Sequence, residues 1–450
     1  MMPKHSLSNS QKIPAFLFVL AASTVSAQAP LTLGDAARLA AKQNTGVDVA
    51  RTKIYQADAR ITQQRAALFP DISGYLQQAQ RTTNTATFGF SFRDAATGQF
   101  LFNPNGQLLG PIPTTDARIG LKQSIFDFAT YARVNAARAA SASAATEVNT
   151  AAEAAAGAAA LAYVRVVRAE AQVAARTADS ALAADLVRIA RDQLQAGVGI
   201  ALDVTRAESQ NANGHVQLIG ARMDRDHARL ELRRALNLPA DAPLVLADSL
   251  GGLPLDNATA DENTLLSRAL DTRADVRALR AQEAAHALQI KAIRAERLPT
   301  LSAVADQGAL GKDWAHPIST YMWGLQVSVP IFDGFRRSAR IEEQEAISNE
   351  YDAREKDIKS QATLEVRSAL VDLAATREQV AAVSDRLRFA EQEVAQAQER
   401  FRAGVAGNSD VIQALLSLNQ TRTLRNDALA SYQSSRVALA RATGGITQIP

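Results

Sequence analysis

The feature that most constrains this chain is an internal duplication. Segments of the first half recur in the second half in the same order. The matching pairs are Leu68-Phe69-Pro70 with Arg297-Leu298-Pro299, Ile125-Phe126-Asp127-Phe128 with Ile331-Phe332-Asp333-Gly334, Gln195-Ala196-Gly197-Val198 with Arg402-Ala403-Gly404-Val405, and Asp203-Val204 with Asp410-Val411. One such match could arise from composition, but several in one order indicate two copies of a structural unit. We therefore divide the chain into a first repeat (28–236), a crossover (237–262), a second repeat (263–445) and a C-terminal tail (446–450).

The first 27 residues have the pattern of a secretory signal peptide. Lys4 and Lys12 form a positive start, residues 13–22 are largely apolar, and Val25-Ser26-Ala27 is a small-residue cleavage site. The alternative, an N-terminal anchor helix, is disfavoured because a spanning helix needs about twenty apolar residues. No later stretch reaches that length, so a mature chain that enters a membrane would do so as a closed β-barrel.

Each repeat predicts the order helix, strand, loop, strand, long helix, tight turn, helix. The expected helices cover about 33–68, 129–196 and 201–236 in the first repeat, and about 263–298, 335–403 and 409–442 in the second. At about 1.5 Å per residue, each long helix would extend about 100 Å. Gly197 and Gly404 follow the long helices and are expected to end them in a left-handed conformation. Two half-length helices stacked end to end would have the length of one long helix, so these helices can form a uniform bundle or cylinder.

A coiled-coil seam follows both long helices with 3-4 spacing. Its residues are Val366, Ala369, Leu373, Thr376, Val380, Val383, Leu387, Ala390, Val394, Ala397 and Phe401, and in the first repeat Ala159, Ala162, Val166, Ala169, Val173, Arg176, Ser180, Ala183, Val187, Ala190 and Leu194. A sustained seven-residue repeat predicts left-handed supercoiling, and the many alanines allow close helix approach. The helices alone leave open a simple soluble coiled coil.

The expected strands, at about 71–93, 116–126, 300–310 and 320–330, argue against that simpler structure. Tyr321, Trp323, Leu325 and Val327 alternate with small or polar residues, and Phe88, Phe90 and Phe92 alternate in the same way. An apolar face opposite a polar face suits a strand between lipid and a watery lumen. The alternative is an edge of a soluble sandwich. Gly98, Pro104, Gly106, Gly110, Pro111 and Pro113 predict a long loop between the first two strands.

Four strands cannot close a barrel, and an open edge in lipid would leave backbone groups unpaired, so the chain must oligomerise.

Together these motifs resemble the TolC family of outer-membrane channels from about Leu31 to Gly445. The resemblance implies a mainly α fold with a membrane β-barrel: a homotrimer whose twelve-stranded barrel lies in outer-membrane lipid and continues as a periplasmic helical coiled-coil tunnel. It also implies a passive conduit for multidrug efflux or type I secretion, and no enzyme. Partners would be a periplasmic adaptor protein and an inner-membrane ABC or proton-driven transporter. The alternative is a periplasmic coiled-coil structural or adaptor protein without a pore.

The same resemblance places a gate at the periplasmic tip. Asp410 matches one acidic ring of the family, whereas Gln413 stands where a second acid is usual. Phe401 replaces a tyrosine and Ala406 an arginine that help to hold the family's tip shut, and Asp203 would face Phe401. We therefore expect a gate held mainly by packing, in which three Asp410 carboxylates favour cations. The alternative role for Asp203 and Asp410 is that of a helix N-cap.

Other chemistry is not indicated by the sequence. The chain contains no cysteine, which excludes thiol chemistry and lipid attachment through an N-terminal cysteine. Its five histidines lack metal-ligand spacing, and the net charge of +3 comes without a basic run that would bind nucleic acid. Acidic residues in the crossover could ligate calcium, but a solvated linker is the stronger expectation. We expect no catalytic residue, metal or cofactor.

Overall fold

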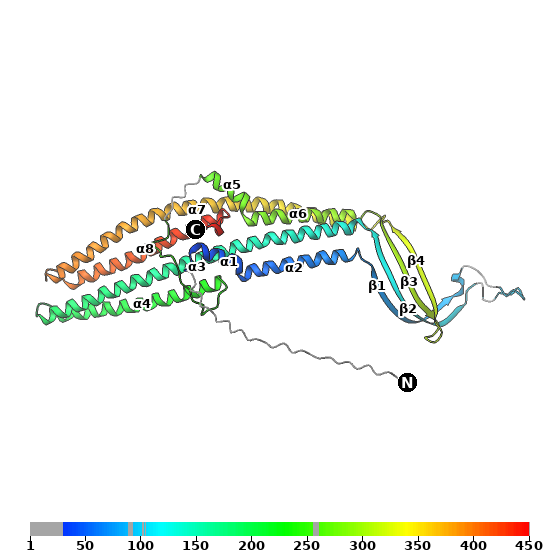
Figure 1. Ribbon diagram of the computed structural model, residues 1–450, viewed down its shortest axis with the longest axis horizontal. Coiled ribbons are helices and arrows are strands. Elements are labelled where there is room, and N and C mark those ends of the chain that lie inside the picture. Colours follow the sequence, from blue (N-terminus) through cyan, green and yellow to red (C-terminus); the bar gives the residue numbers. More distant parts are fainter. Residues whose placement is uncertain (1–29, 89–92, 101–102, 104, 255–260, 450) are drawn as a thin grey trace, which may run out of the picture.

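The computed structural model describes residues 30–88, 93–100, 103, 105–254 and 261–449. The elements in chain order are α1 (Leu33–Gln43), α2 (Thr45–Ala66), β1 (Asp71–Asn84), η1 (Thr85–Phe88), β2 (Leu108–Phe126), α3 (Phe128–Gln195), α4 (Ala201–Ala235), α5 (Glu262–Thr272), α6 (Ala274–Ala295), β3 (Thr300–Gly311), β4 (Ile318–Ser328), α7 (Arg336–Arg402), α8 (Asn408–Ala442) and η2 (Ile446–Gln448). Figure 1 shows an elongated molecule whose long helices lead at one end into a small sheet. The predicted signal peptide lies outside the described residues.

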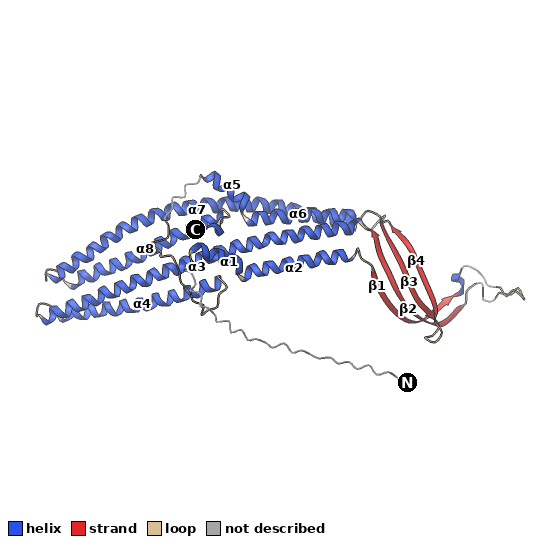
Figure 2. Ribbon diagram, viewed as in Figure 1, coloured by secondary structure: helices blue, strands red, loops and turns tan. Residues whose placement is uncertain are grey.

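The described helices form a wall of four columns. α3 and α7 run the length of the wall; α2 and α4 both pack along α3, and α6 and α8 both pack between α3 and α7. Figure 2 shows α2 and α6 on the side of the sheet, and α4 and α8 at the far end. The predicted pairing of half-length helices with each long helix is therefore confirmed. The column order is α2 with α4, then α3, then α6 with α8, and finally α7.

The prediction of single helices over about 33–68 and 263–298 is wrong, because each is broken. Asn44 has extended backbone angles, and its side-chain oxygen accepts a hydrogen bond from the Gly46 N–H at 2.8 Å, which caps α2. Arg273 is likewise extended between α5 and α6. Because of these breaks, α1 is not continuous with α2, and α5 is not continuous with α6. α1 packs against α3, and α5 packs against α7.

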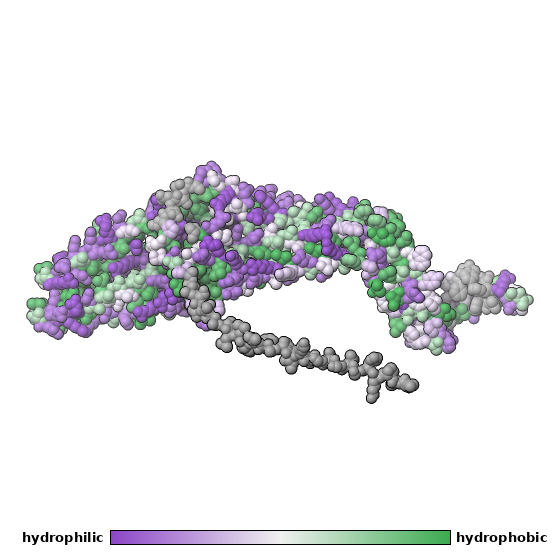
Figure 3. All heavy atoms as spheres, viewed as in Figure 1, coloured by the Kyte–Doolittle hydropathy of each residue, from purple (hydrophilic) through white to green (hydrophobic). Residues whose placement is uncertain are grey.

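Within the described residues the strands form one antiparallel sheet in the order β1-β2-β3-β4. This order matches the order of the columns, since β1 follows α2, β2 leads into α3, β3 follows α6 and β4 leads towards α7. β3 and β4 lie where the sequence predicted them. Figure 3 shows hydrophobic residues gathered where the helices pass into the sheet.

Two predictions about the first pair of strands are wrong. Residues 85–88, including Phe88, form a short 3-10 helix instead of strand, whereas Phe90 and Phe92 lie outside the described residues. The predicted loop extends too far, since Gly110, Pro111 and Pro113 belong to β2. The prolines are tolerated because β2 pairs with β3 only from Thr115 onward, so its earlier residues have a partner strand on one side only.

The coiled-coil seam is confirmed on both long helices, with one exception. Every predicted seam residue of α7 is buried or half-buried, and so are those of α3 except Leu194, which is exposed. α3 also contains a stretch long and apolar enough to cross a membrane, so the prediction that no later stretch reaches spanning length is wrong. More than half of this stretch is buried against the rest of the protein, as in a core helix.

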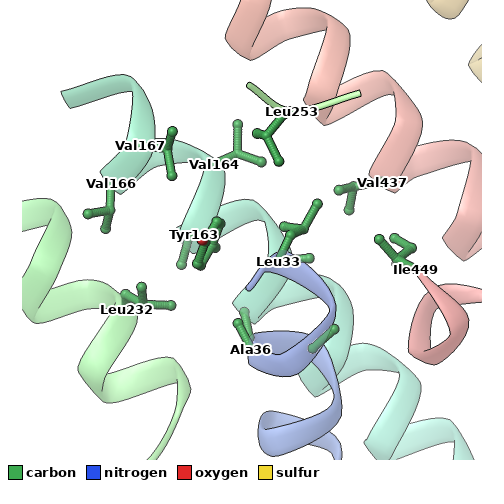
Figure 4. Close-up of a cluster of buried hydrophobic side chains, with 14 of the residues drawn as sticks. Leu33, Ala36, Tyr163, Val164, Val166, Val167, Leu232, Leu253, Val437 and Ile449 are labelled. Atoms are coloured by element: carbon green, nitrogen blue, oxygen red, sulfur yellow. The ribbon is translucent and has the colours of Figure 1, made fainter. Parts of the chain in front are cut away.

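The largest core cluster joins segments that are distant in the sequence. Figure 4 shows Tyr163 of α3 close to Leu33 of α1, with Leu232, Val437 and Ile449 contributed by three further segments. Leu250 and Leu253 of the crossover are also buried in this cluster. The prediction of a solvated linker is therefore wrong for Leu250 and Leu253, whereas the other residues of 237–254 are exposed or half-buried.

The reason is a hydrogen-bonded anchor within the cluster. The Asp248 carboxylate accepts from the Tyr163 hydroxyl at 2.8 Å and from the Leu33 N–H at 3.0 Å. Burial and this carboxylate both raise the pKa of the Tyr163 phenol, which stays protonated and able to donate. Ile446 and Ile449 are buried in the same cluster, so the C-terminal tail contributes to the core.

Candidate functional site

The two helical hairpins end in equivalent turns at the tip of the molecule. After α3, Gly197 has φ +75° and the Val198 N–H donates to the Gln193 carbonyl at 3.0 Å. After α7, Gly404 has φ +72° and the Val405 N–H donates to the Arg400 carbonyl at 3.0 Å. This is the hydrogen-bond pattern of a helix that ends in a left-handed glycine. The predicted role of both glycines in closing the long helices is confirmed.

Two hydrogen bonds join these hairpins, and the sequence did not indicate either. Gln193 Nε2 donates to the Phe401 carbonyl at 2.8 Å, and Asn408 Nδ2 donates to the Asp203 carbonyl at 2.7 Å. Asn408 is fully buried, and its Oδ1 has no partner among the described residues. Because the acceptors are backbone carbonyls, the bonds depend on how the hairpins dock and give no residue-type signal in the sequence.

The tip aspartates occupy the first helical turns and are not N-caps. The N-cap residues are Ile200 for α4 and Gly407 for α8, and neither makes a side-chain capping bond. Asp203 and Asp410 each lie three residues further along. The N-cap interpretation is therefore wrong, although a carboxylate in the first turn still interacts favourably with the helix dipole.

Asp410 and Gln413 are both exposed and lie on one face of α8, because they are three residues apart. Asp203 is half-buried on the neighbouring hairpin. The carboxylate of Asp410 thus remains available to solvent or to another copy of the chain.

Phe401 is 3% exposed and belongs to a second, smaller core at the tip. This core combines Leu186 and Ala190 of α3 with Val411 and Leu415 of α8. The side chain that stands where the TolC family has a tyrosine therefore packs among apolar groups. Packing between hairpins, rather than ion pairs, dominates the described contacts of the tip.

A buried polar layer separates the two cores and was not predicted. The Asp179 side chain on α3 is 3% exposed and lies 2.7 Å from Arg422 Nη1 of α8 and 3.3 Å from Arg176 Nη1. Burial raises the pKa of the Asp179 carboxyl, and Arg422 limits the rise. Arg176 also donates to Thr423 Oγ1 at 2.9 Å. Arg176 and Ser180 are the polar positions of the predicted seam in the first repeat, and they are the sequence signal for this layer.

The sheet has one strongly apolar face. Trp323, Ala305, Leu121 and Ile72 are aligned across the strands, and residues two positions along point the same way. The four residues predicted to face lipid lie on this face and are all exposed in the single chain: Tyr321 (77%), Trp323 (78%), Leu325 (69%) and Val327 (66%). Such exposure is unusual for soluble proteins and indicates a surface covered by another phase or molecule.

The opposite face carries a charged cluster that sequence reasoning missed. Arg118 Nη1 lies 2.8 Å from Asp306 Oδ1, and Arg118 Nη2 lies 2.8 Å from Asp116 Oδ2. The Tyr75 hydroxyl donates to Asp116 at 2.9 Å. Gly308 makes room for Arg118, because a Cβ at this glycine would lie 2.2 Å from the Arg118 Cβ. Charged and polar side chains that form ion pairs and hydrogen bonds with one another are typical of a sheet face that is in contact with water.

The repeated Phe-Asp element lies where the strands pass into the long helices. Asp127 Oδ1 accepts from the Thr130 N–H at 3.0 Å and caps α3. Asp333 Oδ2 accepts from Arg337 Nε at 2.6 Å and from its backbone N–H at 3.1 Å, at the start of α7. The Arg337 guanidinium lowers the pKa of the Asp333 carboxyl, which keeps it charged. The duplicated motif thus secures the change from strand to helix.

The described part of the chain contains no group of three or more His, Asp or Glu residues that could hold a metal ion. His286 is nearly buried and its Nε2 lies 2.9 Å from the Gln344 carbonyl, a structural contact between α6 and α7. The acidic residues of the crossover are likewise not assembled into such a group within the described residues.

The sequence profile of one family matches both halves of the chain. The profile, described as outer membrane efflux protein, covers residues 36–238 and 265–445. The chain belongs to the outer membrane efflux protein family. This confirms the resemblance to TolC-type channels, and the family's proteins are transport conduits and not enzymes.

Curated relatives and solved structures agree with this assignment. The outer membrane efflux protein BepC of Brucella suis biovar 1 is 25% identical over 375 residues, covering 81% of this chain and 80% of BepC. The probable efflux pump outer membrane protein TtgC of Pseudomonas putida is 28% identical over 272 residues, covering 57% of this chain and 53% of TtgC. The chain thus spans about half the length of TtgC.

Among solved structures, the outer membrane protein VceC from Vibrio cholerae superposes with a TM-score of 0.68 at 20% identity, covering 92% of this chain and 96% of VceC. CusC superposes with a TM-score of 0.72 at 17% identity, covering 92% of each chain. These similarities establish the fold: a mainly helical chain with a small antiparallel sheet, as in outer-membrane channels. The family places the protein in the outer membrane with its helices in the periplasm.

Proposed function

We propose that three copies of this chain form an outer-membrane export tunnel. The observation that supports it most directly is the sheet, whose apolar face is exposed in the single chain while its other face is charged. In a closed barrel these become the lipid-facing surface and the lumen. The lipid-facing residues would then be Tyr321, Trp323, Leu325 and Val327.

The open edges of the wall require further copies. β1 and β4 each have one unpaired edge, which lipid cannot satisfy. Pairing β4 of one copy with β1 of the next removes both edges, and the column order places α7 beside α2 and α4 of the neighbour. The number three comes from the resemblance to the TolC family and gives twelve strands and twelve columns.

The edge helices support this closure, because each exposes apolar side chains at helical spacing. On α4 these residues are Val216, Ile219, Met223 and Leu230, and on α7 they are Leu364, Val371 and Phe389. A second copy would bury both rows. The rival function, a periplasmic coiled-coil rod without a pore, could use these rows but leaves the apolar face of the sheet without a role.

The tip would form the gate of the tunnel. Phe401 packs in the apolar tip core, and Gln193 and Asn408 tie the hairpins through backbone carbonyls. We propose that packing and these two bonds hold the tip closed, and that Asp410 from each copy contributes to a ring that favours cations.

The tunnel would work as a passive conduit in a pump that spans both membranes. The partners would be a periplasmic adaptor protein and an inner-membrane ABC or proton-driven transporter, in multidrug efflux or type I secretion. The similarity to TtgC and BepC, which are efflux outer membrane proteins, supports efflux. A groove of about 800 Å³ between α3 and α4 near the tip, which includes Arg188, Arg191 and Glu208, offers a charged docking surface for an adaptor.

The first experiment is to determine the mass of the detergent-extracted protein from separated outer membranes. A trimer confined to that fraction is expected. A soluble periplasmic monomer or dimer would refute the tunnel and favour the coiled-coil rod.

Single-channel recordings test the gate. Asp410→Asn should reduce the preference for cations, whereas Asp224→Asn, an exposed aspartate of α4 away from the tip, should not. Unchanged selectivity in the Asp410 variant would restrict this residue to a helix-dipole contact.

A further inference from the structure

A long groove lies over α3 in the half of the wall next to the sheet. Its volume is about 820 Å³, and it is bordered by α2 on one side and by α6 and α7 on the other. This volume falls within the range of sites that hold drug-sized molecules. None of the tip or strand residues discussed above contributes to it.

The groove is rich in positive charge. Its charged lining residues are Lys53, Arg60, Arg133, Arg340, Glu147 and Glu296. Glu296 lies 2.7 Å from Arg340 and 3.5 Å from Arg133, and Arg133 also lies 3.4 Å from Asp127. Lys53 is only loosely paired with Glu147, at 3.9 Å.

Arg60 makes no ion pair with any described residue, and both Arg60 and Lys53 are exposed on α2. The groove therefore has an excess of two positive charges, carried mainly by the α2 border. An anion in the groove would meet these charges without having to displace a strong internal partner.

The part of the groove formed by α3 contains a row of alanines. They are Ala136, Ala137, Ala140 and Ala144. Tyr351 of α7 contributes an aromatic ring at one border. Glutamine side chains of α2 and α6 complete the lining. A row of alanines beside a cationic border fits a molecule with an apolar body and an anionic group.

The groove lies on the face of the wall turned away from α1. Ala140 and Ala144 of the groove lie on one face of α3. Followed along the helix at a spacing of three or four residues, this face leads to Ala154 and Ala158, which are exposed. The residues that α1 covers, among them Tyr163, are on the other side. If α1 and α5 surround the tunnel on its outside, as in the proposed trimer, the groove faces the lumen.

We propose that this groove is a contact site for amphiphilic organic anions on their way through the tunnel. The proposal rests on the proposed function, since only a tunnel brings cargo to this face. Three copies of the groove form a cationic belt between the barrel and the tip. The belt favours cargo that carries carboxylate or sulfonate groups on an apolar body.

The test is binding of pyranine, a trisulfonated pyrene, to the purified detergent-solubilised trimer, followed by fluorescence anisotropy at low salt. The variant Lys53→Gln/Arg60→Gln should bind the dye about tenfold more weakly, because each exposed charge contact changes an equilibrium by about two- to fivefold. The matched control is Arg51→Gln/Arg65→Gln, which removes the same charge from α2 outside the groove and should bind like wild type.

A variant that keeps the charges tests the shape of the site. Ala140 is exposed in the groove, so Ala140→Phe should fold normally and weaken binding by filling the groove. Equal losses in both double variants would show a general charge effect and overturn the proposal, as would dye binding that none of the variants changes, or no dye binding at all.

Ion conduction of the same preparations in planar bilayers separates the two claims. If the wild type conducts ions but the groove variants do not change dye binding, the proposal for the groove is overturned and the proposal for the tunnel stands. Absence of both conduction and a trimer would refute the tunnel itself, whatever the dye does.

Discussion

Removal of Asp179 alone from the buried layer between α3 and α8 should destabilise the protein more than removal of the closest ion pair, Asp179 with Arg422. In the wild type, Asp179 lies 2.7 Å from Arg422 and 3.3 Å from Arg176, and its side chain is 3% exposed. Asp179→Leu leaves both guanidinium groups without their carboxylate. Asp179→Leu/Arg422→Met replaces the closest pair by apolar side chains and leaves Arg176 with its hydrogen bond to Thr423 Oγ1.

The geometry gives the expected magnitudes. Breaking a fully buried pair costs about 3–5 kcal/mol, because the remaining charge stays desolvated. The side chains of Arg176 and Arg422 are still 17% and 22% exposed, so water reaches them and the lower limit applies. We expect a loss of about 3 kcal/mol for Asp179→Leu and about 1–2 kcal/mol for the double variant, since the apolar replacement removes the desolvation cost of Arg422 while Arg176 still lacks its carboxylate.

Thermal unfolding of the detergent-solubilised protein, followed by circular dichroism, measures the difference. With an unfolding entropy of about 2 cal/mol/K per residue, about 3 kcal/mol corresponds to a Tm lower by about 3 °C for a chain of this size. The double variant should recover part of that shift. A double variant as unstable as Asp179→Leu would refute the reasoning, because the layer would then be held by specific polar contacts and not limited by desolvation.

The same site makes a prediction about pH. Burial raises the pKa of the Asp179 carboxyl above its ordinary value of 3.8. As pH rises from 3.8 to the native pKa, the unfolded chain has lost this proton while the native chain retains it, so the free energy of unfolding declines. Asp179→Asn should remove this decline. An identical pH dependence of Tm in wild type and variant over this interval would contradict the assignment.

Three further substitutions have defined outcomes. Gly308→Ala should abolish the folded trimer on semi-native gels, because its Cβ would lie 2.2 Å from that of Arg118; Gly324→Ala, with no atom within 4 Å, should be tolerated. Tyr163→Phe removes the buried hydroxyl that bonds the half-buried Asp248 carboxylate and the Leu31 carbonyl, so thermal unfolding should show a loss of about 1–3 kcal/mol. Ile446→Asp places a charge in the main core and should prevent accumulation of folded protein in membranes.

Patterns with a regular period could be predicted from the sequence. The seam that includes Val366 and Val380 repeats every seven residues over a long helix, and Trp323 with Leu325 alternates along a strand. Such periods reflect one buried or one apolar face of a regular element, so they appear in the sequence whatever the neighbours are. Gly197 and Gly404 belong with them, because a left-handed helix end requires a residue of this kind locally.

Features that depend on how distant segments dock could not be predicted. The ion pair of Arg273 with Glu365, the packing of Asp248 against Tyr163, and the bond from Gln193 to the Phe401 carbonyl all join residues far apart in the chain. A short polar segment has no hydrophobic period. Whether it is buried or exposed depends on whether another part of the molecule packs against it. The crossover therefore looked like a solvated linker until the core showed what it packs against.

The sequence by itself determined the duplicated plan, the long helices and the two-faced strands, because these follow from local periodicity and from turns set by single residues. Only the tertiary structure decided that the four columns share the order of the four strands, that Arg118 and Asp306 meet on one face, and that Lys53 and Arg60 border a groove with a row of alanines. Charge and shape at a surface are sums over several elements, and their arrangement exists only once those elements have packed.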